Sequence, residues 1–108
     1  MANTFKSAAT GSSATLGAFY TCPAATTAVV HAVYLSNVDG SNDETISLSI
    51  SGSANFNDRK YILKTVDVPA DSTVVIEKPI NLGVGDKLES QASANDDVDV
   101  FASILEMT

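Results

Sequence analysis

The stretch TISLSIS, residues 45–51, decides the fold. Its apolar side chains, Ile46, Leu48 and Ile50, alternate with serines, whereas a helix would space them three and four residues apart. A period of two places the apolar side chains on one face and the serines on the other. The stretch is therefore predicted to be a half-buried β-strand.

Further stretches follow the same pattern or are rich in β-branched residues, and we predict strands over residues 14–21, 28–38, 59–68, 72–77, 87–93 and 97–106. Residues 28–38 are apolar on both faces, which is typical of a central strand. In the last stretch Val98, Val100, Ala102 and Ile104 share one face and are expected to point into the core.

Turn-forming residues separate these strands, at residues 38–43, 51–58, 69–71 and 93–97, with Phe56 as the expected anchor of the longest loop. No helical stripe with capping residues occurs. The sequence thus predicts an all-β fold, a single antiparallel β-sandwich of seven or eight strands. A jelly-roll-like order is favoured, and an immunoglobulin-like order is the alternative.

The chain of 108 residues is one domain in length. Residues 1–13 differ from the rest in their small polar composition, and we predict an N-terminal arm there, followed by the β-sandwich domain over residues 14–108. The arm is either a frayed terminus or an extended segment that adds a strand to a neighbouring subunit, with Phe5 as its anchor.

The charge balance excludes several partners. Six basic residues stand against thirteen acidic ones, a net charge of −7. Nucleic acids and anionic membranes are bound by clustered Lys and Arg, so neither is expected as a partner. The chain has no run of apolar residues typical of a secretory signal or a membrane span, and a single cysteine, so synthesis in the cytoplasm is expected.

Residues 83–86, GVGD, raise the question of a phosphate-binding loop. Such a loop needs a helix after its glycines, so that the helix N-terminus faces the anion. Here the next residues alternate as a strand does. We therefore predict a tight corner in which Gly83 and Gly85 adopt left-handed backbone angles and Asp86 holds the turn.

His31 and Cys22 are the only residues of their types. A histidine base needs a nucleophile or an orienting acid, and a metal site needs companion ligands, and no such pattern occurs. We expect His31 to be packed in the core or at an interface and Cys22 to be a buried free thiol. No catalytic residue, cofactor, metal ligand or small-molecule substrate is predicted, and the chain is not expected to be an enzyme.

Acidic residues form two clusters along the chain: Asp39, Asp43 and Glu44, and then Asp96, Asp97 and Asp99. Neither has the spacing of a calcium-binding loop, although calcium prefers carboxylate oxygens. Solvated hairpin tips, which keep strand edges from aggregating, are the expected explanation. Calcium binding by these loops stays open.

A second apolar face remains after the core is assigned. A sandwich strand needs only one inward face, so additional apolar side chains require cover by another protein. We predict an oligomer or partner interface formed by Phe5, Val30, Tyr34, Phe101 and Leu105.

Four segments, MANTFK (1–6), YTCPAATTAVVHAVYLSNV (20–38), VPADSTVVIEKPINLGVGDKLES (68–90) and DVDVFASILE (97–106), together resemble small structural proteins of tailed-phage virions, common in phages of cyanobacteria and marine bacteria. The resemblance covers most of the chain and lies in strand cadence, without a catalytic motif. It implies a non-enzymatic, multi-copy virion component, made in the host cytoplasm, whose partners are copies of itself and other virion proteins.

Capsid decoration is the favoured station in the particle, and a neck, collar or tail fitting comes next. A host-receptor or glycan-binding module of a tail fibre is the alternative, and it would need exposed aromatic side chains in loops. A cupin-type enzyme would need a cluster of histidines and is disfavoured by the single His31.

Overall fold

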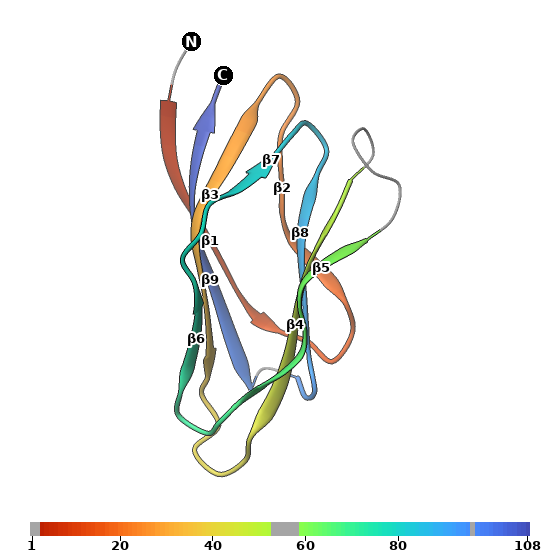
Figure 1. Ribbon diagram of the computed structural model, residues 1–108, viewed down its shortest axis with the longest axis vertical. Coiled ribbons are helices and arrows are strands. Elements are labelled where there is room, and N and C mark those ends of the chain that lie inside the picture. Colours follow the sequence, from red (N-terminus) through yellow and green to blue (C-terminus); the bar gives the residue numbers. More distant parts are fainter. Residues whose placement is uncertain (1–2, 53–58, 96) are drawn as a thin grey trace.

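The computed structural model describes residues 3–52, 59–95 and 97–108, and these fold into two antiparallel sheets packed face to face (Figure 1). The first sheet has the order β1-β9-β3-β6, with β7 also paired to β3; its strands are β1 (Asn3–Ser12), β9 (Val98–Met107), β3 (Thr27–Asn37), β6 (Thr73–Ile76) and β7 (Ile80–Leu82). The second has the order β2-β8-β4-β5; its strands are β2 (Gly17–Thr21), β8 (Lys87–Ala92), β4 (Glu44–Ser51) and β5 (Lys60–Val68).

The strand order is that of a jelly roll. β6 and β7 pair with different parts of the same strand, β3, and three residues ending in Pro79 separate them. Proline cannot donate to a sheet ladder, which explains the interruption. With β6 and β7 taken as one broken strand, the two sheets have the orders 1-8-3-6 and 2-7-4-5 of a jelly roll. The predicted all-β, jelly-roll-like sandwich is confirmed.

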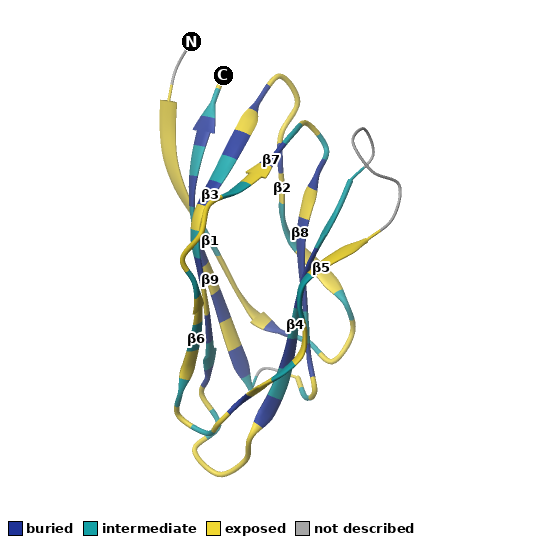
Figure 2. Cartoon of the chain, in the orientation of Figure 1, coloured by how far each residue is buried: buried dark blue, intermediate teal, exposed yellow. Residues whose placement is uncertain are grey.

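The core lies between the sheets and is built mainly from the alternating inward residues of β3, β4, β8 and β9. In β9 the predicted inward residues Val98, Val100, Ala102 and Ile104 are all fully or almost fully buried (Figure 2). Ile46 and Leu48 of β4 are fully buried, whereas Ile50 is only half-buried, and Ser49 is buried although it was predicted to face outward. Register shifts against β5 on both sides of Leu48 account for this irregularity.

A β-bulge in β3 overturns part of the predicted face assignment. Val30 pairs with Ile104 of β9, and Ala32 pairs with the next residue, Ser103, so His31 is one extra residue in β3. The extra residue exchanges the two faces of the strand on its N-terminal side. Val30 therefore points into the core and is 0% exposed, and the prediction that it lies on the outer surface is wrong.

The segment predicted as an N-terminal arm forms a strand of the same sandwich over most of its length. β1 pairs with β9 in an unbroken register from Asn3↔Met107 to Ser12↔Val98. Eight of its ten residues are exposed, so its side chains bury little and the backbone ladder to β9 supplies most of its attachment. Exchange of this strand with a neighbouring subunit stays a prediction.

The domain is elongated, with extents of 47 × 27 × 20 Å. The two termini lie together at one end, because β1 begins opposite the end of β9, and the β3–β4 and β8–β9 loops lie at the other end (Figure 1). The described part of the chain contains no helix with the length and apolar character needed to cross a membrane.

Candidate functional site

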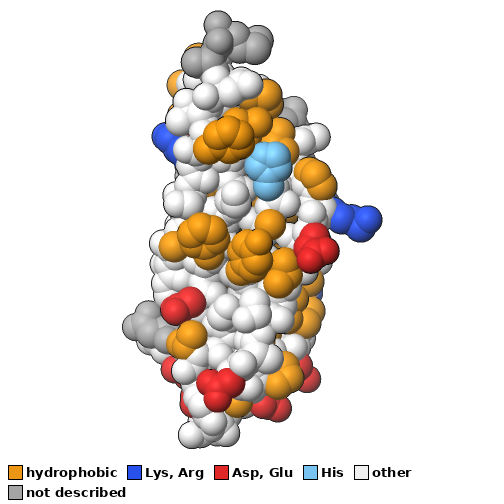
Figure 3. All heavy atoms as spheres, turned by 90° about the vertical axis from the view of Figure 1, so that its left-hand side faces the viewer, with side chains coloured by type: hydrophobic (Ala, Val, Ile, Leu, Met, Phe, Trp, Pro, Cys, Tyr) orange, Lys and Arg blue, Asp and Glu red, His pale blue; other side chains and the backbone are white. Residues whose placement is uncertain are grey.

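The side of the first sheet that faces away from the core is rich in apolar side chains. We call it the outer apolar face and define it by seven outward residues: Phe5, Val29, Ala32, Tyr34, Val75, Phe101 and Leu105. Phe5 is 78% exposed, and Tyr34 and Phe101 are 41% and 42% exposed. Figure 3 views the molecule from this side and shows hydrophobic side chains gathered over the middle and upper part of the face.

Strand register arranges these residues in two cross-strand rows. One row runs Ala9–Phe101–Tyr34–Val75 through β1, β9, β3 and β6. Within it the rings of Tyr34 and Phe101 lie 6.1 Å apart and are tilted by 53°, a favourable aromatic geometry. The second row runs Phe5–Leu105–Val29. Side chains directly opposite each other on neighbouring strands form continuous ridges, so the face presents two apolar ridges.

Charge is nearly absent from this face. Among the outward positions of the five strands of the first sheet, all within the described residues, only Asp99 is charged. Figure 3 shows most acidic side chains gathered toward the lower end and the basic ones at the margins. Interface cores of proteins are depleted of charged residues in this way and enriched in aromatic ones.

The structure brings together four of the five predicted interface residues. Phe5, Tyr34, Phe101 and Leu105 all lie on the outer apolar face, and only Val30 does not. Their role as an interface stays a prediction.

Local strand geometry also sets the positions of His31, beside the outer apolar face, and of Val75, within it. His31 is exposed on the bulge, so it is not packed in the core, and its predicted place at an interface stays untested. Val75, 38% exposed, completes the first row, and the alternation of Thr73 and Val75 with Val74 and Ile76 was the signal for it.

The GVGD corner is structural. Gly85 has a φ of 83°, as predicted, whereas Gly83 has no positive φ. The backbone N–H of Gly83 donates to Asp86 Oδ2 at 2.9 Å, and the N–H of Asp86 donates to the Gly83 carbonyl at 3.0 Å. Because β8 follows directly, no helix N-terminus faces this corner. Asp86 holds the turn, which confirms the structural interpretation.

Cys22 is a buried free thiol, as expected. Its Sγ donates to the carbonyls of Thr26 and Leu82 at 3.3 and 3.7 Å. Burial raises the pKa of the thiol, and the negative charges of Glu106 and Asp86 raise it further. A buried thiol with a raised pKa is a poor nucleophile.

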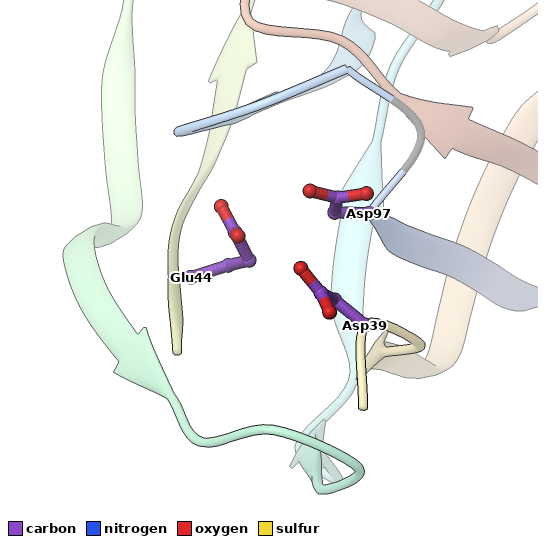
Figure 4. A group of neighbouring side chains, drawn as sticks. All are labelled: Asp39, Glu44 and Asp97. Atoms are coloured by element: carbon purple, nitrogen blue, oxygen red, sulfur yellow. The ribbon is translucent and has the colours of Figure 1, made fainter. Parts of the chain in front are cut away.

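Carboxylates from three different segments converge at the end of the sandwich that is opposite the termini. Asp39 lies in the β3–β4 loop, Glu44 begins β4 and Asp97 precedes β9, and Figure 4 shows their carboxylates turned toward one another. One oxygen from each lies within 4.8 Å of the others. The topology thus brings together members of two acidic clusters that are separate in the sequence.

The other acidic residues of these clusters lie elsewhere. Asp43 accepts a hydrogen bond from the backbone N–H of Ala70, Asp99 is exposed on the outer side of β9, and Asp96 lies outside the described residues, as does Phe56. The signal for Glu44 was its spacing, since it stands two residues before the inward Ile46 and so occupies an inward position of β4.

Hydrogen bonds from nearby residues stabilise two members of this trio. The backbone N–H of Ser41 donates to Asp39 Oδ1 at 2.9 Å and holds the pKa of that carboxyl below its ordinary value, and Asn42 acts in the same direction. The Ser93 hydroxyl donates to Glu44 Oε1. Three such oxygens are of the type that calcium takes as ligands, although calcium takes six to eight.

A second buried carboxylate ties the two sheets together. Glu106 of β9 is 5% exposed, accepts a hydrogen bond of 2.6 Å from the Tyr20 hydroxyl of β2, and pairs with Lys6 Nζ of β1 at 3.1 Å. The Tyr20 hydrogen bond, and then Lys6, hold the pKa of Glu106 below its ordinary value, although burial acts in the opposite direction. Burial and this carboxylate raise the pKa of Tyr20. The cluster is satisfied within the fold.

An open groove of about 700 Å³ lies at the edge of the first sheet opposite β1, beside β5. Ile62 of β5 lines it together with residues 75–80 of the β6–β7 region. The lining is mostly aliphatic, and it brings together no set of groups for acid–base or metal chemistry.

No protein-family model matches this chain, and no curated protein and no solved structure matches it either.

Proposed function

We propose that this chain is a non-enzymatic structural protein of a tailed-phage virion, present in multiple copies, that stabilises the particle through protein–protein contacts made by the outer apolar face. The observation that supports the proposal is the pair of apolar ridges, with Tyr34 and Phe101 at the centre of the longer one. Phe5, Tyr34 and Phe101 are 78%, 41% and 42% exposed on one sheet face. Exposed apolar and aromatic side chains gathered in this way are typical of a protein interface.

The energetics suit a particle component. Burying a large apolar side chain from water contributes about 1.5–3 kcal/mol. A few such side chains in each copy give a weak single contact, but a symmetric shell or ring engages many copies at once, and avidity then multiplies weak contacts. Capsid decoration is the favoured station within this proposal, and a neck, collar or tail fitting is the second.

A glycan-binding module of a tail fibre is the alternative function, and jelly rolls occur among lectins as well as capsid proteins. Sugar-binding modules stack aromatic side chains on sugar rings, usually from loops. In this chain Tyr34, Phe101 and Tyr61 all lie within strands, and Phe56 lies outside the described residues. The aromatic positions therefore favour a broad protein contact over a sugar site.

A reconstruction of the purified particle at side-chain resolution tests the proposal. We expect copies of this chain on the particle with Tyr34 and Phe101 buried against protein. Hundreds of copies on the shell indicate decoration, and a ring of a dozen or fewer indicates a neck or tail fitting. A particle that lacks the chain, or that carries it with this face in contact with solvent, contradicts the proposal.

A further inference from the structure

Strand β1 is an edge of the first sheet that lacks the usual protection against pairing with another strand. It pairs with β9 on one side, and no strand of the described chain pairs with its other side. Successive residues of an edge strand direct their N–H and C=O groups alternately toward the neighbour and away from it. β1 therefore directs the backbone N–H and C=O groups of every second residue toward its open side, where no strand of the described chain pairs with them.

Natural proteins protect such edges by short length, bulges, prolines or charged side chains. β1 has none of these in effective form. Its register with β9 is unbroken over all ten residues, it contains no proline, and its single charged residue, Lys6, is paired with Glu106.

The other three edges of the sandwich are protected. β2 has five residues and a register shift between Ala18 and Tyr20. β5 is irregular against β4 and carries Thr65 with a φ of 52°, together with the exposed Lys60 and Lys64. The fourth edge is broken into β6, of four residues, and β7, of three. Within one domain, β1 is thus the long and regular edge, whereas the other three are short or irregular.

We propose that β1 pairs antiparallel with β1 of a second copy of this chain, about a two-fold axis at Ser7, so that the two first sheets join into one continuous sheet. A two-fold axis brings the same strand of both copies together, as in most homodimers. The occupant of the free edge is thus β1 itself.

The sequence of β1 is complementary to itself in this register. Ser7 lies opposite the partner's Ser7, Phe5 opposite the partner's Ala9, and Asn3 opposite the partner's Gly11. On the inner side Lys6 lies opposite the partner's Ala8, so no like charges face each other. The small Ala9 leaves room for the ring of Phe5, the most exposed large apolar side chain of the described residues.

The same register joins the apolar ridges of the two copies. The row that ends at Ala9 in one copy continues into the row that begins at Phe5 in the other, because these two residues lie opposite each other. The ridges then run from Val29 of one copy to the partner's Val75. Continuity of the outer apolar face across the joint favours a second copy over an unrelated strand.

Charge distribution favours the antiparallel arrangement. The acidic loops lie at the end of the sandwich opposite the termini, and β1 runs along its length (Figure 1). Antiparallel pairing places the two acidic ends at opposite ends of the dimer. A parallel arrangement would bring two such ends together in a chain of net charge −7.

This inference deepens the proposed function by naming one partner and the strand that contacts it. It rests on the proposal that copies assemble, and it does not require a virion. The chain alone in solution tests it, whereas the particle reconstruction tests the virion proposal, so the two can fail separately.

Two adjacent proline variants, Ser7→Pro and Ala8→Pro, supply a matched pair for sedimentation experiments on the full chain. Because N–H directions alternate, one proline removes a bond of the β1–β9 ladder and the other removes only an outward N–H. We expect the wild type to sediment as a dimer at micromolar concentration. One variant should lose thermal stability, and the other should melt as the wild type does in dilute solution yet sediment as a monomer.

Cross-linking tests the register. In a Ser7→Cys variant two thiols meet across the axis, and a short bis-maleimide should link them in high yield. In the control Gly11→Cys the two thiols lie roughly 27 Å apart, because eight residues of strand separate them, and no link should form. A wild type that is monomeric at high micromolar concentration, a stable proline variant that stays dimeric, or equal cross-linking of both cysteine variants overturns the inference.

Discussion

At the scale of single residues, the most informative side chains are the buried carboxylates. Glu106 sits in a mostly apolar interior only because Tyr20 and Lys6 satisfy it. Glu89 is held in the same way: burial alone would raise its pKa, but the hydrogen bond from Arg59 Nε at 2.8 Å, with help from Ser49, holds the pKa below its ordinary value. Both acids join residues of different strands or segments through these contacts.

Replacing Glu106 by Gln should lower the free energy of unfolding by about 1–3 kcal/mol at neutral pH, because the pairing with Lys6 and the charged acceptor for Tyr20 are lost. The exposed Glu77→Gln is the control and should change stability by less than about 0.5 kcal/mol. Urea unfolding of the three proteins measures both values. Equal stability of Glu106→Gln and the wild type would contradict the role given to this cluster.

The same carboxylate predicts a pH dependence. The pKa of Glu106 is lowered in the folded state. Its contribution to the free energy of unfolding is therefore fully present above the unfolded carboxyl pKa of about 4.3, and it is lost as the pH falls through the folded-state pKa. The wild type should therefore lose more stability than Glu106→Gln between about pH 5 and pH 2. Parallel stability curves for the two proteins over that range would show that Glu106 does not contribute.

Cys22 should be unreactive in the folded protein, because the thiol is buried and its pKa is raised. A maleimide at neutral pH should modify it only after unfolding in urea, as followed by intact-mass measurement. Rapid, stoichiometric modification under native conditions would contradict the buried position.

At the scale of elements, the sequence predicts most strands and misses two for physical reasons. Strands with a buried face carry a period-two apolar pattern, and the seven predicted stretches correspond to β2, β3, β4, β5, β6, β8 and β9. β1 buries almost no side chains, so its sequence does not need, and does not have, a period-two apolar pattern. β7 has only three residues, too few for a period to show.

The sequence does not reveal where a β-bulge occurs or which distant residues meet in space. The extra residue at His31 needs no special residue type, yet it reverses the faces of Val29 and Val30. The grouping of Asp39 and Glu44 with Asp97 depends on which loops share one end of the sandwich, and that is a property of the topology. The outer apolar face was found in the sequence because the register of β9 and of the second half of β3 is regular.

Because of the bulge, substitutions at the neighbouring residues Val29 and Val30 should have different effects on stability. Val30→Ala removes a fully buried side chain and should lower the free energy of unfolding by about 2 kcal/mol, whereas Val29→Ala on the outer face should lower it by less than about 1 kcal/mol. Thermal or urea unfolding distinguishes them. A larger loss for Val29→Ala would mean that the bulge is absent and the unshifted alternation holds.

At the scale of the whole molecule, acidic loops, chain termini and apolar side chains occupy different parts of the surface. Its acidic loops lie at one end, its termini at the other, and its apolar ridges along one broad side (Figures 1 and 3). A jelly roll alone does not specify function. The asymmetry of this one supports assembly, because the charged end keeps the chain soluble while the apolar side is available for other subunits.

Competitive incorporation into particles tests most directly whether the outer apolar face is the contact surface. Equal amounts of wild type and a variant are supplied during particle assembly, and their ratio in purified particles is measured by mass spectrometry. The matched control is Tyr61→Gln, an aromatic residue of equal exposure (43%) on β5 of the other sheet. We predict that Tyr34→Gln combined with Phe101→Gln is incorporated at least about tenfold less than wild type, since two buried aromatic contacts are lost, and that Tyr61→Gln is incorporated equally. Equal incorporation of the double variant would contradict the account.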